Sequence, residues 1–151
     1  MKRTLIIHIG AHRTATSALQ DYLYANFTNL QEKGFFYPFK VRRHLKLVND
    51  LFKKERSPAE VAKTITERAD SREHKINTVI LSDEDICMRR DLSLLAEFRA
   101  WFDVKVVFTL RRQDTWLESW FFQNIKWQWN ANLSHCTFDE FLAKRENFHW
   151  I

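Results

Sequence analysis

Glycine and proline are scarce in this sequence of 151 residues, which contains only two of each. These counts exclude collagen-like, glycine-rich linker and proline-rich structures, and they argue against an all-β fold, which needs many turn residues. The two cysteines, Cys87 and Cys136, have neither a metal-binding nor a redox spacing. No apolar run approaches the ~20 residues of a membrane span. We therefore expect a cytoplasmic protein with no membrane span, no disulfide scaffold and no metal site.

Apolar and charged residues are both plentiful. Hydrophobic residues make up 45% of the chain and charged residues 28%, which favours a globular core over disorder, and the length fits one domain. The 24 basic and 19 acidic residues give a net charge of +5. Such a mild excess suits an anionic ligand such as a phosphate or a nucleotide, and it is too small to require nucleic acid.

Three short apolar runs, over residues 5–9, 78–81 and 104–110, predict buried strands. Between and after them, apolar residues at helical spacing predict helices that begin near residues 16, 43, 58, 92 and 114. Gly34 stands where a glycine ends the first of these helices, and Ser57 with Pro58 marks the start of the third. Strands that alternate with helices indicate an α/β fold with a parallel sheet, in which ligands bind at the carboxyl ends of the strands.

Polar segments follow all three strands, over residues 10–17, 82–85 and 111–119, and we expect them to meet in space. The first lies between a strand and a helix, so backbone N–H groups and the helix dipole point at one anion site. Arg13 adds a cation, and Thr16 and Ser17 add hydroxyl groups; the alternative is that Thr16 or Ser17 is an ordinary helix cap. The segment is not a Walker A loop, because a glycine and the Lys-Ser/Thr pair are missing at the required spacing.

The third polar segment begins with two arginines, Arg111 and Arg112, that leave a buried strand. Such a position is costly unless the arginines meet an anion or a carboxylate. Asp114 can cap the next helix, and Ser119 can face the same ligand as the arginines. The alternative is that both arginines only pair with the carboxylates of residues 83–85. Further along this helix, Trp116 and Trp120 stand four residues apart and are expected to pack in a core.

Residues 7–20, Ile-His-Ile-Gly-Ala-His-Arg-Thr-Ala-Thr-Ser-Ala-Leu-Gln, resemble the 5′-phosphosulfate loop of sulfotransferases, in particular of the bacterial and heparan N-deacetylase/N-sulfotransferase-like branches. Residues 106–119 resemble the 3′-phosphate motif of that family, in which a serine stands eight positions after a strand-end arginine; here these are Arg111 and Ser119. Lesser similarities over residues 35–38, 81–84 and 138–142 follow in the expected order. The resemblance implies a P-loop NTPase-like three-layer α/β fold around a parallel central sheet.

The same resemblance implies a co-substrate, 3′-phosphoadenosine 5′-phosphosulfate, and transfer of its sulfuryl group to a hydroxyl or amine acceptor, with a carbohydrate as one candidate. Arg111 and Ser119 would hold the 3′-phosphate, whereas the 5′-phosphosulfate would be held by Arg13, Thr14, Ala15, Thr16 and Ser17. Catalysis would rest on Arg13 and on Glu84 as the general base, with Asp83 and Asp85 as rivals. Alternatively, Glu84 is only a carboxylate favoured at a helix start. No metal is needed if arginine supplies the positive charge.

The sequence departs from the family pattern in three ways. Arg13 replaces the loop lysine, and Ala15 replaces a loop glycine, which is tolerable only if φ is negative there. The sequence also looks like the amino-terminal half of a family member, so we expect an incomplete domain over residues 1–151. Apolar residues in segments 116–129 and 138–151 would then lack packing partners, so we expect marginal stability, association of chains, and weak donor binding or no catalysis.

Two alternative functions stay open at this point. The first is a nucleotide-binding remnant without catalysis, which the short length and the changes at Arg13 and Ala15 favour. The second is a module that binds nucleic acid or another polyanion through the basic residues between positions 40 and 56.

Overall fold

The computed structural model describes residues 2–128 and 130–144, and the chain divides into two compact units, Met1–Thr109 and Leu110–Ile151. The first unit contains the sheet and the second contains helices α6 to α8. The expected single sulfotransferase-like domain over residues 1–151 stays a prediction. Four apolar residues singled out in the sequence lie outside the described residues: Trp129, Phe148, Trp150 and Ile151.

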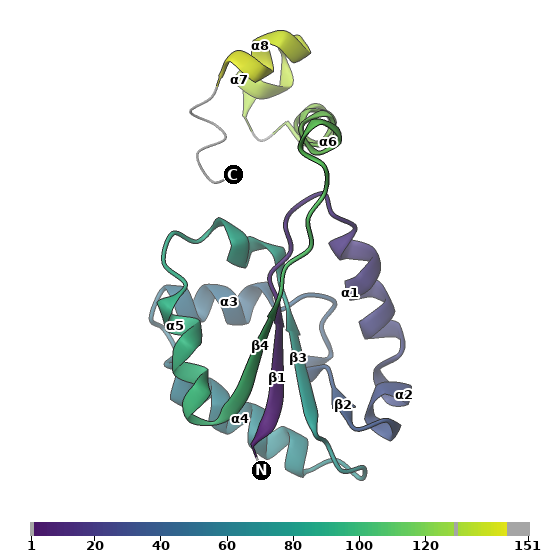
Figure 1. Ribbon diagram of the computed structural model, residues 1–151, viewed down its shortest axis with the longest axis vertical. Helices are drawn as coiled ribbons and strands as arrows, with labels where there is room; N and C mark the ends of the chain where they lie inside the picture. Colours follow the sequence, from purple (N-terminus) through teal and green to yellow (C-terminus); the bar gives the residue numbers. More distant parts are fainter. Residues whose placement is uncertain (1, 129, 145–151) are drawn as a thin grey trace. The chain divides into compact units, whose positions relative to one another are not determined.

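The first unit is built on a parallel sheet whose strand order is β2-β3-β1-β4 (Figure 1). Its strands are β1 (Arg3–His8), β2 (Phe35–Phe36), β3 (Thr78–Ser82) and β4 (Phe102–Val107). The predicted α/β class with a parallel sheet is confirmed. Because all strands run in one direction, the segments that follow β1, β3 and β4 all start from the same edge of the sheet.

Helices cover both faces of this sheet (Figure 1). One face carries α1 (Thr16–Ala25) and α2 (Phe27–Glu32); the other carries α3 (Leu45–Phe52), α4 (Pro58–Asp70) and α5 (Ser93–Ala96). Three short 3₁₀ helices are η1 (Pro38–Lys40), η2 (Glu84–Met88) and η3 (Glu97–Ala100). The predicted capping residues are confirmed, since Gly34 follows α2 at φ +79° and Ser57 forms a capping box with Glu60.

Two of the predicted helices differ from the structure. The helix expected from residue 16 to Gly34 is divided into α1 and α2 at Asn26. The helix expected near residues 92–102 ends at Ala100, and Phe102 begins β4 instead. Both differences lie at element boundaries, where periodicity alone says least about structure.

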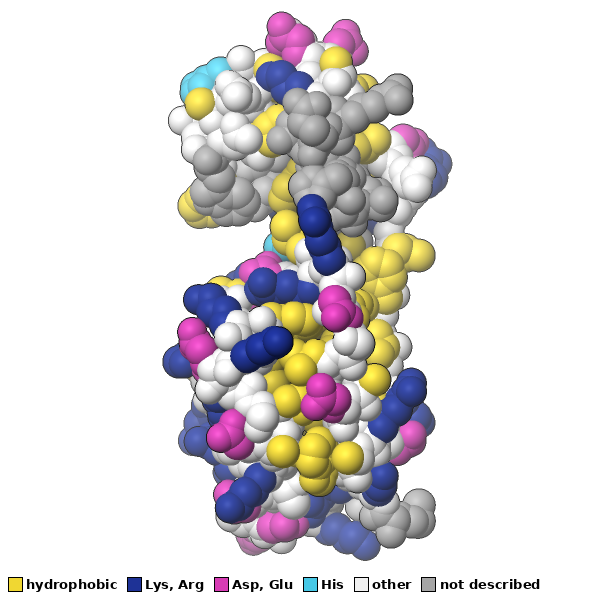
Figure 2. Space-filling model, turned by 90° about the vertical axis from the view of Figure 1, so that its left-hand side faces the viewer, with side chains coloured by type: hydrophobic (Ala, Val, Ile, Leu, Met, Phe, Trp, Pro, Cys, Tyr) yellow, Lys and Arg dark blue, Asp and Glu magenta, His cyan; other side chains and the backbone are white. Residues whose placement is uncertain are grey.

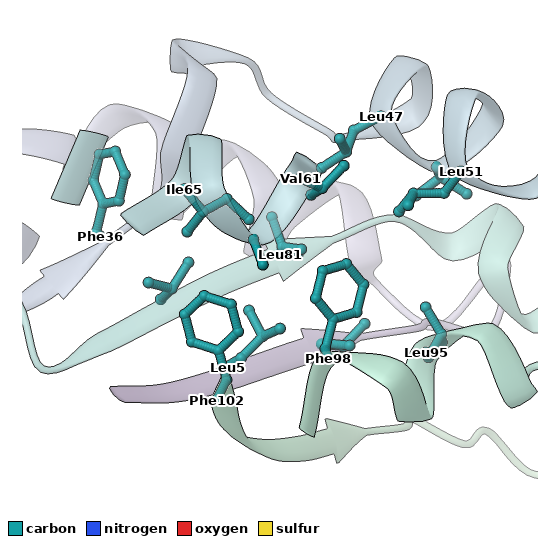
Figure 3. Close-up of a cluster of buried hydrophobic side chains, with 14 of the residues drawn as sticks. Leu5, Phe36, Leu47, Leu51, Val61, Ile65, Leu81, Leu95, Phe98 and Phe102 are labelled. Atoms are coloured by element: carbon teal, nitrogen blue, oxygen red, sulfur yellow. The ribbon is translucent and has the colours of Figure 1, made fainter. Parts of the chain in front are cut away.

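The main core lies between the sheet and helices α3, α4 and α5, which pack on the same face (Figure 3). Leu5 and Ile7 of β1 and Val79 and Leu81 of β3 are all fully or almost fully buried in it. Side chains alternate between the faces of a strand, so His8 and the neighbouring Ser82 lie on the opposite face, the side of α1. The alternation therefore brings the buried polar side chains of His8 and Ser82 to the carboxyl end of the sheet.

The second unit contains α6 (Gln113–Lys126), α7 (Ala131–Ser134) and α8 (Phe138–Ala143). The rings of Trp116 and Trp120 stack at 5.8 Å, and Trp116 is buried, which confirms the core packing predicted for Trp116. Phe121 packs against Phe138 and Phe141, with ring centroids 5.3 Å apart in each pair. Across the described residues of both units, no helix is long and apolar enough to cross a membrane.

Candidate functional site

The carboxyl ends of β1 and β3 are where this fold is expected to bind a ligand. The chain leaves β1 toward α1 on one face of the sheet, and it leaves β3 toward η2 and α5 on the other (Figure 1). Where neighbouring parallel strands continue to opposite faces, ligands commonly bind beyond their carboxyl ends. The predicted meeting of the segments after these two strands is confirmed, because a Cβ placed on Gly10 would lie 2.6 Å from Cβ of Glu84.

The loop between β1 and α1 is held in an unusual backbone conformation. Gly10, Arg13 and Ala15 all have left-handed φ values, of +83°, +64° and +63°. The expectation of a negative φ at Ala15 is wrong: the loop keeps a conformation that favours glycine although the residue is alanine. Its Cβ costs about 1–2 kcal/mol in that conformation. Loops that alternate handedness in this way turn successive N–H groups toward one point, as anion-binding nests do.

Helix α1 begins directly from this loop, with Ala15 as its N-cap, and Ala15 makes no side-chain capping hydrogen bond. The alternative reading, in which Thr16 or Ser17 acts as the cap, is therefore wrong. The first N–H groups of a helix have no partner within the helix, and here the N-cap side chain caps none of them. The start of α1 is thus able to bind an anion through backbone N–H groups and the positive end of the helix dipole.

Thr14 and Thr109 fasten the loop to the residues that follow β4. The Thr14 hydroxyl donates to the carbonyl oxygen of Ala11 at 2.6 Å and lies 2.8 Å from the hydroxyl of Thr109. The backbone of Thr109 exchanges hydrogen bonds with Ala11 and Gly10, at 3.1 and 3.0 Å. The conformation of the loop is therefore fixed from both sides, by its own helix and by the end of β4.

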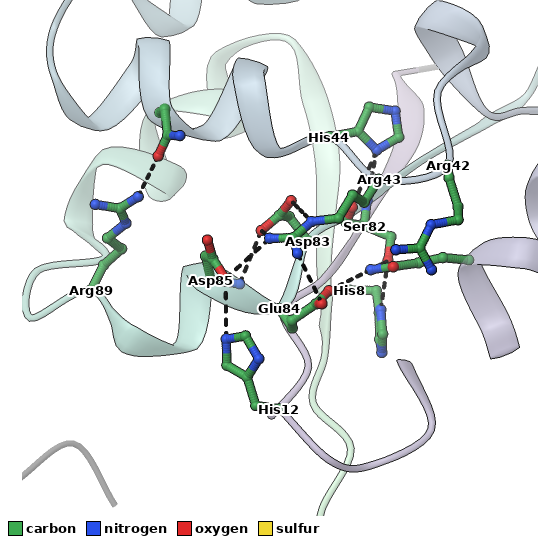
Figure 4. Close-up of polar contacts among 12 residues, drawn as sticks. His8, His12, Arg42, Arg43, His44, Ser82, Asp83, Glu84, Asp85 and Arg89 are labelled. Atoms are coloured by element: carbon green, nitrogen blue, oxygen red, sulfur yellow. Dashed lines mark hydrogen bonds and ion pairs between the residues drawn. The ribbon is translucent and has the colours of Figure 1, made fainter. Parts of the chain in front are cut away.

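Arg43, which precedes β3 in the sequence, contacts all three carboxylates of the segment that follows β3 (Figure 4). Its guanidinium makes two hydrogen bonds to the carboxylate of Asp83, at 3.0 and 3.1 Å, and lies 3.2 Å from Glu84 and 3.0 Å from Asp85. His12, from the loop after β1, lies 3.1 Å from Asp85 and lowers the pKa of that carboxyl. Burial raises the pKa of Asp83, although the hydrogen bonds from Arg43 oppose this. One guanidinium thus serves three carboxylates, which leaves the cluster with an excess of negative charge.

Glu84, the predicted general base, is almost fully buried in this cluster. Besides Arg43, its carboxylate accepts a hydrogen bond of 2.6 Å from the side-chain amide of Gln20 in α1. Two partners do not exhaust a carboxylate, which offers about four lone-pair positions. The side chain is therefore fixed in orientation while it keeps the capacity to accept another proton donor.

His8 and Gln20 place further polar atoms beside Glu84. Nδ1 of His8 lies 2.8 Å from the hydroxyl of Ser82, and both side chains are buried. The other ring nitrogen of His8, Nε2, and the side-chain oxygen of Gln20 are buried without a hydrogen-bond partner. Burial lowers the pKa of His8. Unpartnered buried polar atoms are uncommon, and two of them beside Glu84 indicate a place where a water or a ligand group completes the hydrogen bonding.

His44 holds the segment that carries Arg43 against the end of β3. Its Nε2 lies 3.0 Å from the carbonyl oxygen of Pro38, and the N–H of Ser82 donates to its Nδ1 at 3.1 Å. This arrangement needs the neutral ring, protonated on Nε2, and burial lowers the pKa of His44 from 6.5 to about 4. The neutral ring is therefore what positions Arg43 beside the carboxylates.

The remaining predicted site residues, Arg111 and Ser119, belong to the second unit. The Arg111 guanidinium donates to the hydroxyl of Thr115 at 3.2 Å, and Ser119 is buried within α6. Arg112 precedes α6 and forms two hydrogen bonds with Asp114, at 2.8 and 2.6 Å. The predicted capping role of Asp114 is wrong, because α6 begins one residue earlier, after Arg112. That Arg111 and Ser119 meet the loop after β1 stays a prediction.

Sequence reasoning missed most of the side chains that surround Glu84. A signal for His8 was present, since it is a polar residue at the end of an apolar strand. Gln20 belongs to the helical stretch after the loop, and its spacing does not distinguish it from a solvent-facing residue. Arg43 comes from a segment about forty residues before its partners, among other basic residues, so no local pattern identifies it.

No group of metal-binding side chains occurs within residues 2–128 and 130–144. Comparisons of the sequence and structure with protein-family models, with curated proteins and with solved structures find no match. The chemistry of the site therefore has to be inferred from its own residues.

Proposed function

We propose that this chain binds 3′-phosphoadenosine 5′-phosphosulfate and transfers its sulfuryl group to a hydroxyl or amine acceptor, with carbohydrates as one candidate class. The observation that carries the proposal is the loop after β1, whose left-handed residues lead into an uncapped helix start beside a buried carboxylate. That loop follows a central strand of the sheet, as a P-loop-like fold requires. The sequence resemblance supplies the identity of the donor.

In this proposal the chain's residues divide the work of an in-line transfer. Arg13 and the first N–H groups of α1 hold the phosphosulfate and stabilise the charge that gathers on it. Glu84 accepts the proton of the acceptor while the acceptor oxygen or nitrogen bonds to sulfur and the bond from sulfur to the 5′-phosphate oxygen breaks. Gln20 and Arg43 keep Glu84 in place, and the negative excess of the cluster favours an acceptor that donates a proton.

Arg111 and Ser119 would bind the 3′-phosphate of the same donor. Arg111 follows Thr109 by two residues, and two peptide units span at most ~7 Å. Since Thr109 is hydrogen-bonded to the loop, chain connectivity alone keeps the backbone of Arg111 near it.

Calorimetry with 3′-phosphoadenosine 5′-phosphate tests the binding step. Arg13→Ala and Arg111→Ala should each weaken binding by about 1.5–3 kcal/mol, the range for hydrogen bonds to charged groups. Arg99→Ala is the matched control, because Arg99 is exposed in η3, before the other end of β4, and should bind as the wild type does. Wild-type affinity in both site variants, with the fold intact, would overturn the proposal. A steep salt dependence on DNA or RNA without nucleotide binding would identify the polyanion-binding alternative.

Transfer of labelled sulfate tests the catalytic step. Glu84→Gln keeps the size of the side chain and removes the base, so turnover should fall by ~10²–10⁴ while nucleotide binding survives. Unchanged turnover would move the role to Asp83 or Asp85. The burial of Glu84 between two partners also favours the second candidate, a nucleotide-binding protein without catalysis. Nucleotide binding by the wild type with no detectable transfer to any hydroxyl or amine would support that candidate.

A further inference from the structure

The outer edge of β4 and the residue after it expose apolar side chains. β4 pairs with β1 on its inner side, and among the described residues no strand lies on its outer side. Val106, Val107 and Phe108 are 55%, 41% and 49% exposed. Figure 2 looks at the side of the molecule on which β4 and α5 lie, and hydrophobic side chains gather there between charged ones. The prediction of a fully buried third strand is therefore wrong, because only its first residue is buried.

The backbone of β4 shows which of its groups face outward. The N–H of Ile9 in the chain after β1 donates to the carbonyl oxygen of Val107 at 3.0 Å, so Val107 points its backbone toward β1. In a parallel strand, successive residues alternate in this respect. Phe102, Val104 and Val106 consequently direct their N–H and C=O groups away from the sheet. An edge strand with such a row of groups is a template for another strand.

The charged residues of β4 are arranged symmetrically about Val104. Asp103 and Lys105 lie on the same face of the strand, each with a side chain 64% exposed, and their charged atoms are 4.0 Å apart. If a second copy of β4 runs antiparallel with Val104 opposite Val104, Asp103 of each copy lies opposite Lys105 of the other. Phe102 then lies opposite Val106, so the apolar residues also face apolar residues.

We propose that two copies of this chain associate through β4, edge to edge and antiparallel, centred on Val104, to form one continuous sheet across the dimer. The two neighbouring registers are disfavoured by charge repulsion. A dimer axis at Asp103 would set the two copies of Asp103 opposite each other, and a dimer axis at Lys105 would do the same for the two copies of Lys105. The outward groups of Phe102, Val104 and Val106 then pair with their counterparts. The contact is isologous, so it closes as a dimer with two-fold symmetry.

Sedimentation of the full chain over a wide concentration range tests this arrangement. The wild type should form a reversible dimer. Asp103→Lys and Lys105→Asp each set like charges opposite each other in both cross-strand pairs, so each should raise the dissociation constant roughly ten-fold or more. An equimolar mixture of the two variants should dimerise again, because every cross-strand pair then joins opposite charges. A monomeric wild type, or a dimer that neither charge reversal weakens, would overturn the proposal.

A backbone variant provides an independent test. Val106→Pro removes an outward N–H, and the hydrogen bonds to β1 are kept because they involve the residues on either side. It should abolish the dimer, whereas Val106→Thr, which keeps the N–H and the branched shape, should leave the dimer in place. Circular dichroism and the thermal transition show whether each variant is folded. A folded Val106→Pro variant that dimerises like the wild type would contradict edge pairing.

Discussion

The loop after β1 and the segment after β3 lie against each other at one edge of the sheet, but they are stabilised in different ways. The segment after β3 is held by side chains, with Arg43 on three carboxylates and His44 on the backbone of Ser82. The loop after β1 is held by backbone geometry, with left-handed residues and no side-chain cap at the start of α1. In the first arrangement every carboxylate has a partner within the chain. The second places the N–H groups of a helix start, without a cap from the N-cap residue, where an anion can bind them.

Removal of the Arg43 side chain tests whether side chains hold the segment after β3. It should cause the largest loss of stability among these variants. Arg43→Ala leaves the fully buried carboxylate of Asp83 without its bidentate partner, which should cost about 3–5 kcal/mol of unfolding free energy. The loss should shrink at acid pH, where Asp83 is protonated. Urea denaturation measures both effects.

The neighbouring Arg42 serves as the control for Arg43. It is exposed and lies 3.6 Å from Asp21, so Arg42→Ala should cost about 1 kcal/mol or less. Equal losses in the two variants would mean that the carboxylates do not depend on Arg43.

Substitution at Gly10 tests how closely the two regions fit together. Gly10→Ala would require a Cβ at a left-handed φ and 2.9 Å from Cα of Glu84, so we expect a loss of about 2–5 kcal/mol from strain and overpacking together. Gly34→Ala is the matched control, because φ is also left-handed there but the nearest atom is 3.2 Å away. Its loss should be smaller, about 1–2 kcal/mol. Similar losses at both glycines in thermal or urea unfolding would argue against a tight contact with Glu84.

The parts of this molecule that could be predicted from the sequence are those fixed by local patterns. Apolar runs located β1, β3 and the start of the loops, and Ser57 with Pro58 identified a helix start because the signals of a helix start involve only neighbouring residues. The exposure of β4 could not be predicted, since a run of valines reads the same whether or not a further strand covers it. The role of Arg43 and the φ of Ala15 could not be predicted either, because both are imposed by tertiary contacts of distant segments.

Acid pH should weaken the anchoring of the segment that carries Arg43. Burial lowers the pKa of His44 to about 4, against 6.5 for an ordinary histidine, so the unfolded chain takes up a proton first as the pH falls. Stability is therefore complete above pH 6.5 and is lost between pH 6.5 and 4, by about 2 kcal/mol on going from pH 7 to pH 5.

Urea unfolding of the wild type and of His44→Gln at several pH values measures this contribution. The variant should lack most of the slope between pH 6.5 and 4. His8, whose pKa is also lowered by burial, contributes to the slope with the same sign. An unchanged slope in His44→Gln would show that His44 is not the group that titrates.

The smallest expected change in stability comes from Ala15, and it tests whether backbone geometry alone holds the loop after β1. Ala15→Gly removes a Cβ that costs about 1–2 kcal/mol at a left-handed φ, and the greater freedom of glycine in the unfolded chain offsets about 0.5–1 kcal/mol of this. We therefore expect a gain of up to about 1 kcal/mol. Ala18→Gly is the control, because Ala18 lies inside α1, where the same substitution should cost about 1 kcal/mol. Opposite signs for the two variants in urea unfolding would show that the loop stores strain at Ala15. If both variants are destabilised alike, the loop does not store strain at that residue.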